Sequence, residues 1–101
     1  MSEPIYNGLT AKQLELLELV GEECIEVLKV LQKIKRFGFQ AIDPHTRITY
    51  DNRRDLEAEI GHVFNAVDLL CKTGDIRPQL IHTAKIEKQD TVYDYLRHQD
   101  E

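Results

Sequence analysis

Residues 10–38 read TAKQLELLELVGEECIEVLKVLQKIKRFG and carry the clearest structural signal in the chain. Apolar residues recur there every three or four positions, which is typical of one buried stripe along an α-helix; they are Leu14, Leu17, Val20, Cys24, Leu28, Leu31 and Ile34. Thr10 followed by Gln13 is a capping box and predicts the start of this helix. Gly38, directly after Phe37, can supply the turn that ends it. This stretch therefore predicts one long amphipathic helix.

Two further helices are expected. Asp51 or Asn52 can cap the start of the second helix, and Thr-Gly-Asp at 73–75 ends it. Its apolar stripe contains Leu56, Ile60, Val63, Phe64, Val67, Leu70 and Cys71. Pro78 suits the first turn of a third helix, whose polar middle predicts a far half that is bent, frayed or packed on another chain. Residues 38–50 carry glycine and an Asp-Pro pair and predict a loop.

These patterns predict an all-α protein with a single domain, its core at about residues 10–98. We expect an antiparallel helical bundle of two long helices and a C-terminal helix. Three helices cannot cover both flanks of their apolar stripes, so dimerisation is expected to complete a larger bundle of the four-helix kind. A chain of 11.8 kDa exposes about 6,000 Å² when folded, which allows only a thin core.

Composition narrows the classes of function. Among the 101 residues, 42% are hydrophobic and 31% charged, and no run approaches the ~18 apolar residues of a membrane span. The net charge of −5 argues against a general nucleic-acid partner. Because no basic segment leads into an apolar one near the start, we expect no secretory signal and a cytoplasmic location. Cys24 and Cys71 are expected to be reduced thiols in the core.

Carboxylates follow the edges of both predicted stripes. On the first helix, Glu23 is followed by Glu26 three residues later, a spacing that places Cβ atoms about 5–6 Å apart. On the second, Glu59 is flanked by Asp55 one turn earlier and by His62 one turn later. If the helices pack antiparallel, the two acidic ridges face each other across a cleft and could share a divalent cation such as Mg²⁺. The alternative is an ordinary solvated acidic face.

Two motifs at these positions resemble a known family. Residues 21–26, GEECIE, match a Glu-Glu-x-x-Glu motif, and residues 59–62, EIGH, approximate a Glu-x-x-Asp motif within an apolar helix. The chain is similar in these motifs to the all-α nucleoside triphosphate pyrophosphohydrolases of the MazG-like superfamily, above all to short, often phage-encoded members. The linker KIKRFGFQAIDP and the position of basic residues on the last helix also match, so the resemblance covers roughly residues 10–98.

The resemblance implies an activity and a set of site residues. The reaction would be hydrolysis of an NTP or dNTP to the monophosphate and pyrophosphate, with Mg²⁺ as cofactor. The protein would be a homodimer or homotetramer and would lie in the cytoplasm, which is the host's cytoplasm if the protein is phage-encoded. The implied metal ligands are Glu23, Glu26, Glu59 and, in the fourth position, His62. Glu22 and Glu23 are the implied catalytic residues, and the implied substrate-binding cations are Lys85, Lys88 and Arg53.

His62 departs from the family pattern, which has aspartate there. Because imidazole is a better ligand for Mn²⁺ than for Mg²⁺, the site could favour such a metal. It could instead use three carboxylates and an extra water, or be a degenerate copy that serves as a binding or regulatory protein on the same scaffold. A fourth interpretation is that His62 only hydrogen-bonds Glu26 or Asp55.

Three aromatic residues are candidates for stacking against a nucleotide base. They are Phe37, Phe39 and Phe64, and Phe64 is expected in the core because it lies within the apolar stripe of the second helix.

Overall fold

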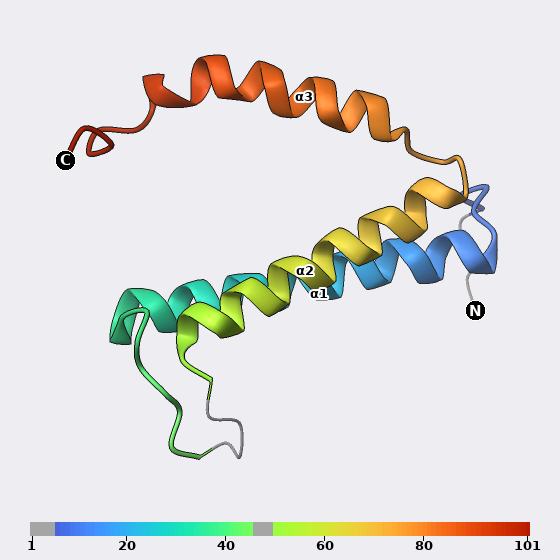
Figure 1. Ribbon diagram of the computed structural model, residues 1–101. Coiled ribbons are helices and arrows are strands. Elements are labelled where there is room, and N and C mark those ends of the chain that lie inside the picture. Colours follow the sequence, from blue (N-terminus) through green and yellow to red (C-terminus); the bar gives the residue numbers. More distant parts are fainter. Residues whose placement is uncertain (1–5, 46–49) are drawn as a thin grey trace.

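The computed structural model describes residues 6–45 and 50–101 and is helical in architecture over those ranges. Three α-helices follow one another, α1 (Ala11–Phe37), α2 (Asn52–Lys72) and α3 (Pro78–Thr91), and a short 3₁₀ helix, η1 (Val92–Asp94), comes last (Figure 1). An isolated antiparallel bridge between Ile42 and Asp51 is the only strand-like pairing in this part of the chain. The predicted all-α class is confirmed. None of the described helices is long and apolar enough to cross a membrane.

Both ends of α1 form as the sequence predicts. Thr10 Oγ1 accepts a hydrogen bond from the Gln13 backbone N–H at 3.1 Å, and Gln13 Oε1 accepts one from the Thr10 N–H at 2.8 Å, which completes the capping box. At the other end Gly38 has φ +87°, a conformation that favours glycine, and its N–H donates to Ile34 O at 2.8 Å. The predicted bounds of the first helix are therefore confirmed.

The other helix starts differ in how they are capped. Asp51, and not Asn52, caps α2, because Asp51 Oδ1 accepts from the Arg54 N–H at 2.9 Å. This leaves Asn52 as the first helical residue. Pro78 opens α3 as predicted, but the preceding Arg77 makes no side-chain capping bond.

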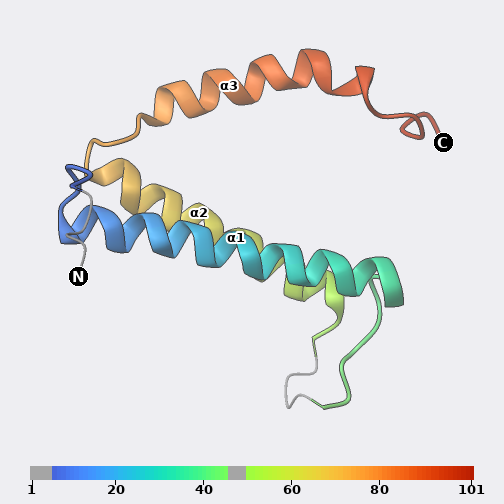
Figure 2. The same cartoon turned by 180° about the vertical axis from the view of Figure 1, so that it is seen from behind.

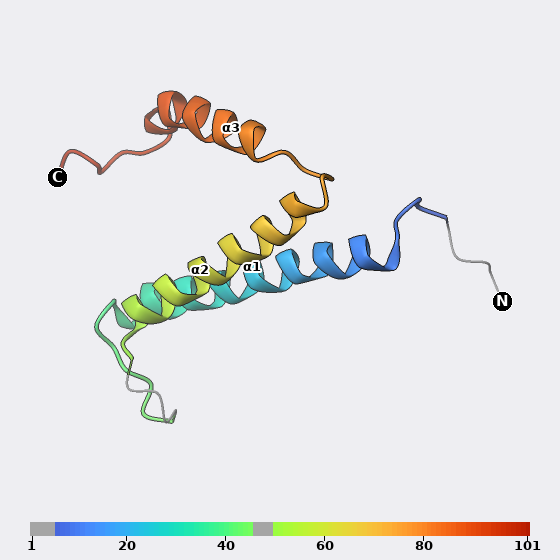
Figure 3. The same ribbon diagram turned by 45° about the vertical axis from the view of Figure 1, so that its right-hand side comes forward.

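The helices form a hairpin with a separate arm. Helices α1 and α2 lie side by side and run antiparallel, and the loop after α1 joins them (Figure 1, Figure 2). Helix α3 leaves the end of α2 and stands apart from the hairpin in each view, including the turned one (Figure 3). The described part of one chain is thus an open hairpin, and the completed bundle stays a prediction.

The core within this hairpin is small. Its buried apolar residues are Val30 on α1 and Ala66 and Leu70 on α2. The accessible surface is 8,983 Å², against the roughly 6,000 Å² that a compact chain of this mass exposes. The radius of gyration is 17.8 Å, whereas a compact chain of this length has about 13 Å. A single chain therefore leaves a large apolar surface uncovered.

Two expectations about that core are wrong for the single chain. Cys24 is exposed and Cys71 half-buried, and both are free thiols. Phe64, expected in the core, keeps 66% of its surface accessible. The reason is geometric, since the apolar stripes are wider than the strip along which α1 and α2 contact each other.

Candidate metal centre

Three side chains of the hairpin converge on one point. Glu23 comes from α1, and Glu59 and His62 come from α2; their potential ligand atoms all lie within 4.8 Å of one another. His62 Nδ1 lies 3.4 Å from Glu59 Oε2 and 3.6 Å from Glu23 Oε2. The contact with Glu59 is a long hydrogen bond within α2, and the contact with Glu23 across the hairpin is longer than a hydrogen bond.

The helix register explains this convergence. Glu59 and His62 are three residues apart and share one face of α2, and the antiparallel hairpin sets the middle of α1 opposite them. The Glu23 and Glu59 side chains are 23% and 19% exposed, whereas that of His62 is 58% exposed. The carboxylates therefore lie at the edge of the helix contact, with the imidazole toward solvent. The expected meeting of the two acidic ridges is found at these three residues, and their role as ligands stays a prediction.

Other residues implied by the motifs lie outside this cluster. Glu26 Oε1 is 3.1 Å from Lys29 Nζ on its own helix, and both side chains are well exposed. Glu22 is exposed and borders a shallow hollow with Glu15 and Glu18. The predicted roles of Glu22 and Glu26 are not tested by these positions.

The neighbours of His62 differ from those expected. It lies beside Glu59 and Glu23, so the interpretation that it hydrogen-bonds Glu26 or Asp55 is wrong. For Glu26 the error arises because sequence spacing does not show which residue of the other helix lies opposite. For Asp55 it arises because that residue is seven positions from His62 along α2, whereas Glu59 is three positions away and therefore nearer.

One chain does not bring the predicted substrate-binding cations to the cluster. Lys85 and Lys88 are exposed on α3, which stands apart from the hairpin, and Lys88 Nζ lies 5.3 Å from the centroid of the Tyr95 ring (Figure 3). Arg53 lies at the start of α2, with its guanidinium carbon 5.1 Å from the centroid of the Phe39 ring. Their role in binding a triphosphate remains a prediction.

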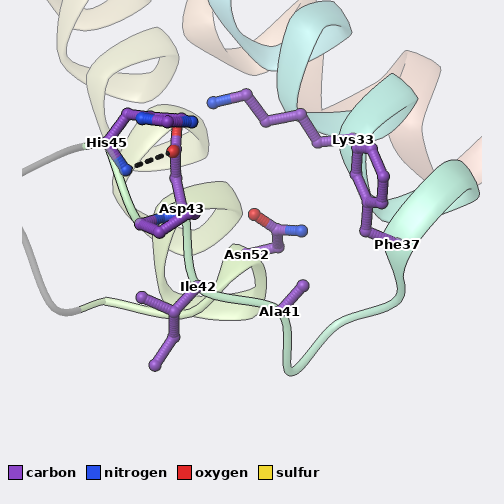
Figure 4. A pocket seen from close by; sticks show the side chains of 8 residues that line it. Lys33, Phe37, Ala41, Ile42, Asp43, His45 and Asn52 are labelled. Carbon is purple, nitrogen blue, oxygen red and sulfur yellow. Dashed lines mark hydrogen bonds between the residues drawn. The ribbon is translucent and has the colours of Figure 1, made fainter.

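The structure also shows a hollow that the sequence did not indicate. It has a volume of about 360 Å³, lies where the loop after α1 meets α2, and is lined by Lys33, Phe37, Ile42, Asp43, His45 and Asn52, among others (Figure 4). The sequence marks Asn52 as a possible helix cap and as part of the linker that resembles the family, and neither role indicates a hollow. The sequence signal for its place beside the hollow is the Asp51-Asn52 pair. Only one of the two residues can cap the helix, so when Asp51 does so the side-chain amide of Asn52 needs another partner.

Comparisons with protein-family models, with curated proteins and with solved structures find no match to this chain.

Proposed function

We propose that this protein is a metal-dependent nucleoside triphosphate pyrophosphohydrolase of the MazG-like kind, which hydrolyses an NTP or dNTP to the monophosphate and pyrophosphate. The observation that carries the proposal is the convergence of Glu23 with Glu59 and His62 across the hairpin. These residues belong to two motifs far apart in the sequence, and both motifs resemble the metal-binding motifs of that superfamily. A solvated acidic face would not require the two helices to aim carboxylates at one point.

The donor set is suited to a divalent cation. Glu23 and Glu59 offer oxygen and His62 offers nitrogen, a combination that suits Mn²⁺ better than Mg²⁺. Glu26 could join only by leaving Lys29, and an exposed pair of this kind contributes about 0–1 kcal/mol, so little opposes that movement. The pairing with Lys29 therefore opposes only weakly a movement of Glu26 toward the three-carboxylate pattern of the family.

The chemistry divides between the metal and the chain. A bound divalent cation would neutralise phosphate oxygens and lower the pKa of an attacking water. In the reaction, the water oxygen bonds to the α-phosphorus while the bond from that phosphorus to the α–β bridging oxygen breaks, and pyrophosphate leaves with the electron pair. The proton lost by water needs a base, for which the resemblance implies Glu22, next to Glu23 in the motif. Its exposed side chain lies outside the cluster in one chain and would have to turn toward the bound water to act.

We further propose that a second copy of the chain completes the bundle, as a homodimer or homotetramer. An apolar hollow of about 260 Å³ lies between α1 and α2 and is lined by Cys24, Val27, Ile60, Val63 and Phe64. It adjoins the cluster, because Cys24 directly follows Glu23 and Ile60 directly follows Glu59. A second hairpin would cover this face, and its α3 is one source of Lys85 and Lys88 for the triphosphate. The surface of 8,983 Å² in a single chain supports the same proposal.

The test is pyrophosphate release from the common NTPs and dNTPs with Mg²⁺ or Mn²⁺. Glu23→Gln and Glu59→Gln should each lower turnover by about a hundredfold or more, because metal assistance contributes several kcal/mol. Glu57→Gln is the matched control, since Glu57 is exposed on the same helix as Glu59 and outside the cluster. Circular dichroism should show equal helicity in all four proteins. Full turnover in both cluster variants would exclude this site.

A second candidate function is a binding or regulatory protein that keeps the scaffold without the chemistry. It is favoured by His62, which stands where the family has aspartate and is more exposed than either carboxylate beside it. His62→Asp distinguishes the two candidates. A large gain of activity from a start near zero supports the degenerate copy, and substantial activity of the unaltered protein with Mn²⁺ supports the enzyme.

A further inference from the structure

The hollow at the loop end of the hairpin has walls of different chemistry. Figure 4 shows the Phe37 ring on one side, Asp43 and His45 on the other, and Asn52 between them, while the Lys33 side chain extends across toward Asp43 and His45. Its volume of about 360 Å³ falls in the range of small-molecule sites. One aromatic wall, one cation and one amide are thus present in a single concave space.

Asn52 is the polar group that defines what this hollow can accept. The residue is only 7% exposed, and its Nδ2 donates to Gly38 O at 3.1 Å. That bond orients the amide, so Oδ1 is the end that faces the hollow (Figure 4). No described residue donates to Oδ1. A ligand that fills the hollow must therefore bring an N–H or O–H group, because an apolar one would leave this acceptor unpaired at a cost.

The first part of the loop, residues 39–42, is held against the start of α2. The Asn52 N–H donates to Ala41 O and the Arg53 N–H to Phe39 O, each at 2.9 Å. Together with the bridge between Ile42 and Asp51, these bonds tie the loop to the first turn of α2. The wall of the hollow formed by Ala41, Ile42 and Asn52 is therefore preorganised for a ligand.

The hollow and the metal centre lie on the same side of α2. Asn52 precedes Glu59 by seven residues, which places it about 20° from the same face and about 10 Å away along the axis. On α1, Phe37 lies 14 residues after Glu23, about 21 Å along the axis, so a ligand has to be fully extended to reach both the metal centre and this ring. A ligand with its phosphates at Glu23 and Glu59 can extend its other end toward Asn52.

The geometry points to this hollow as the site for the base of a nucleotide: Phe37 stacks against the ring and Asn52 Oδ1 accepts a hydrogen bond from a ring or exocyclic N–H. Lys33 is positioned to donate to a carbonyl oxygen of the base or to an oxygen of the sugar. A free anion fits poorly, since the Asn52 oxygen and the Asp43 carboxylate both face the same space. The inference rests on the proposed function for the phosphate end of the ligand. It adds the recognition of the base, which the metal centre cannot supply.

The test uses nucleosides, which have no phosphate and need no metal. Uridine, cytidine, adenosine and guanosine are titrated into isotope-labelled protein, and chemical shifts are followed by NMR. We expect saturable shifts at the Asn52 side-chain amide and the Phe37 ring, with no metal added. Phe37→Ala should weaken binding by about fivefold to a hundredfold, the usual effect of removing a ring that stacks on a base.

Phe39→Ala is the matched control. Phe39 lies in the loop two residues after Phe37, the last residue of α1, and is 48% exposed, against 64% for Phe37. Each ring has a guanidinium near it, Arg53 for Phe39 and Arg36 for Phe37, but only Phe37 lines the hollow. Its removal should change nucleoside affinity less than twofold. Asn52 itself is left unaltered because its amide holds the loop. Absent shifts at the solubility limit of the nucleosides, shifts elsewhere on the protein, or equal effects of the two variants would overturn the inference.

The same proteins distinguish this inference from the proposed function. Glu23→Gln should lose pyrophosphate release yet keep the nucleoside shifts at Phe37 and Asn52. Nucleoside binding in the hollow without hydrolysis of any nucleotide would exclude the enzyme and leave the base site standing. Hydrolysis of a nucleotide without nucleoside binding in the hollow would support the enzyme and exclude the base site.

Discussion

The hairpin and the α3 arm come from one chain but differ in how completely they are built. Helices α1 and α2 hold the buried apolar residues, and a capping box, an Asp cap and a glycine turn define three of their ends. Helix α3 has no side-chain cap and no buried residue, and its apolar side chains at Leu80, Ile81 and Ile86 are exposed. Apolar spacing alone therefore does not create a core; a covering partner is needed. The hairpin contains its partner, and the arm does not.

The largest effect that separates the two regions is expected from leucine truncation. Leu70→Ala, in the buried strip of α2, should lower the free energy of unfolding by about 2–5 kcal/mol, because it removes apolar contact and leaves a cavity. Leu80→Ala, on the exposed arm, should change it by at most about 0.5 kcal/mol. Urea unfolding followed by circular dichroism measures both. Similar losses for the two variants would show that α3 is as well packed as the hairpin.

The helix ends could be predicted from sequence because their signals are local. Thr10 with Gln13, Gly38 after Phe37, and Pro78 each act within one turn of their own position, and each is found where expected. Residues 38–50 were predicted as a loop; residues 46–49 of it lie outside the described residues, and the rest carries only a single bridge.

Exposure and cross-helix neighbours could not be predicted in the same way. Periodicity places Cys24 and Phe64 on a stripe but does not show which part of the stripe is covered, and one chain leaves both of these side chains exposed. The sequence spacing puts Glu23 and Glu26 on the same ridge of α1 and does not distinguish them. Only the register of α1 against α2 brings Glu23 to His62, whereas Glu26 pairs with Lys29 on its own helix. The burial of Asn52 depends on a bond to a loop carbonyl, which leaves no periodic trace.

A smaller effect concerns association between chains. If a second copy covers the hairpin face, Phe64→Glu should weaken self-association by about tenfold or more, since a charge would enter a desolvated apolar contact. Light scattering over a range of concentrations measures the mass of each variant. Tyr93→Glu tests the arm in the same way, because Tyr93 of η1 is as exposed as Phe64. Loss of association with Tyr93→Glu alone would move the interface from the hairpin to the arm, and a monomeric unaltered protein would exclude the second copy.

The smallest effect is expected at the uncapped start of α3. Arg77→Asp supplies a side-chain acceptor and a negative charge near the helix N-terminus, which together stabilise the helix by about 0.5–1 kcal/mol. If the arm unfolds independently, hydrogen exchange of α3 amides should slow by about two- to fivefold while the unfolding of the hairpin stays unchanged. Thr10→Ala is the counterpart in the hairpin and should cost about 1 kcal/mol in its unfolding, because it breaks the capping box. A rise in hairpin stability with Arg77→Asp would instead mean that α3 unfolds together with α1 and α2, and that the two regions form one cooperative unit in solution.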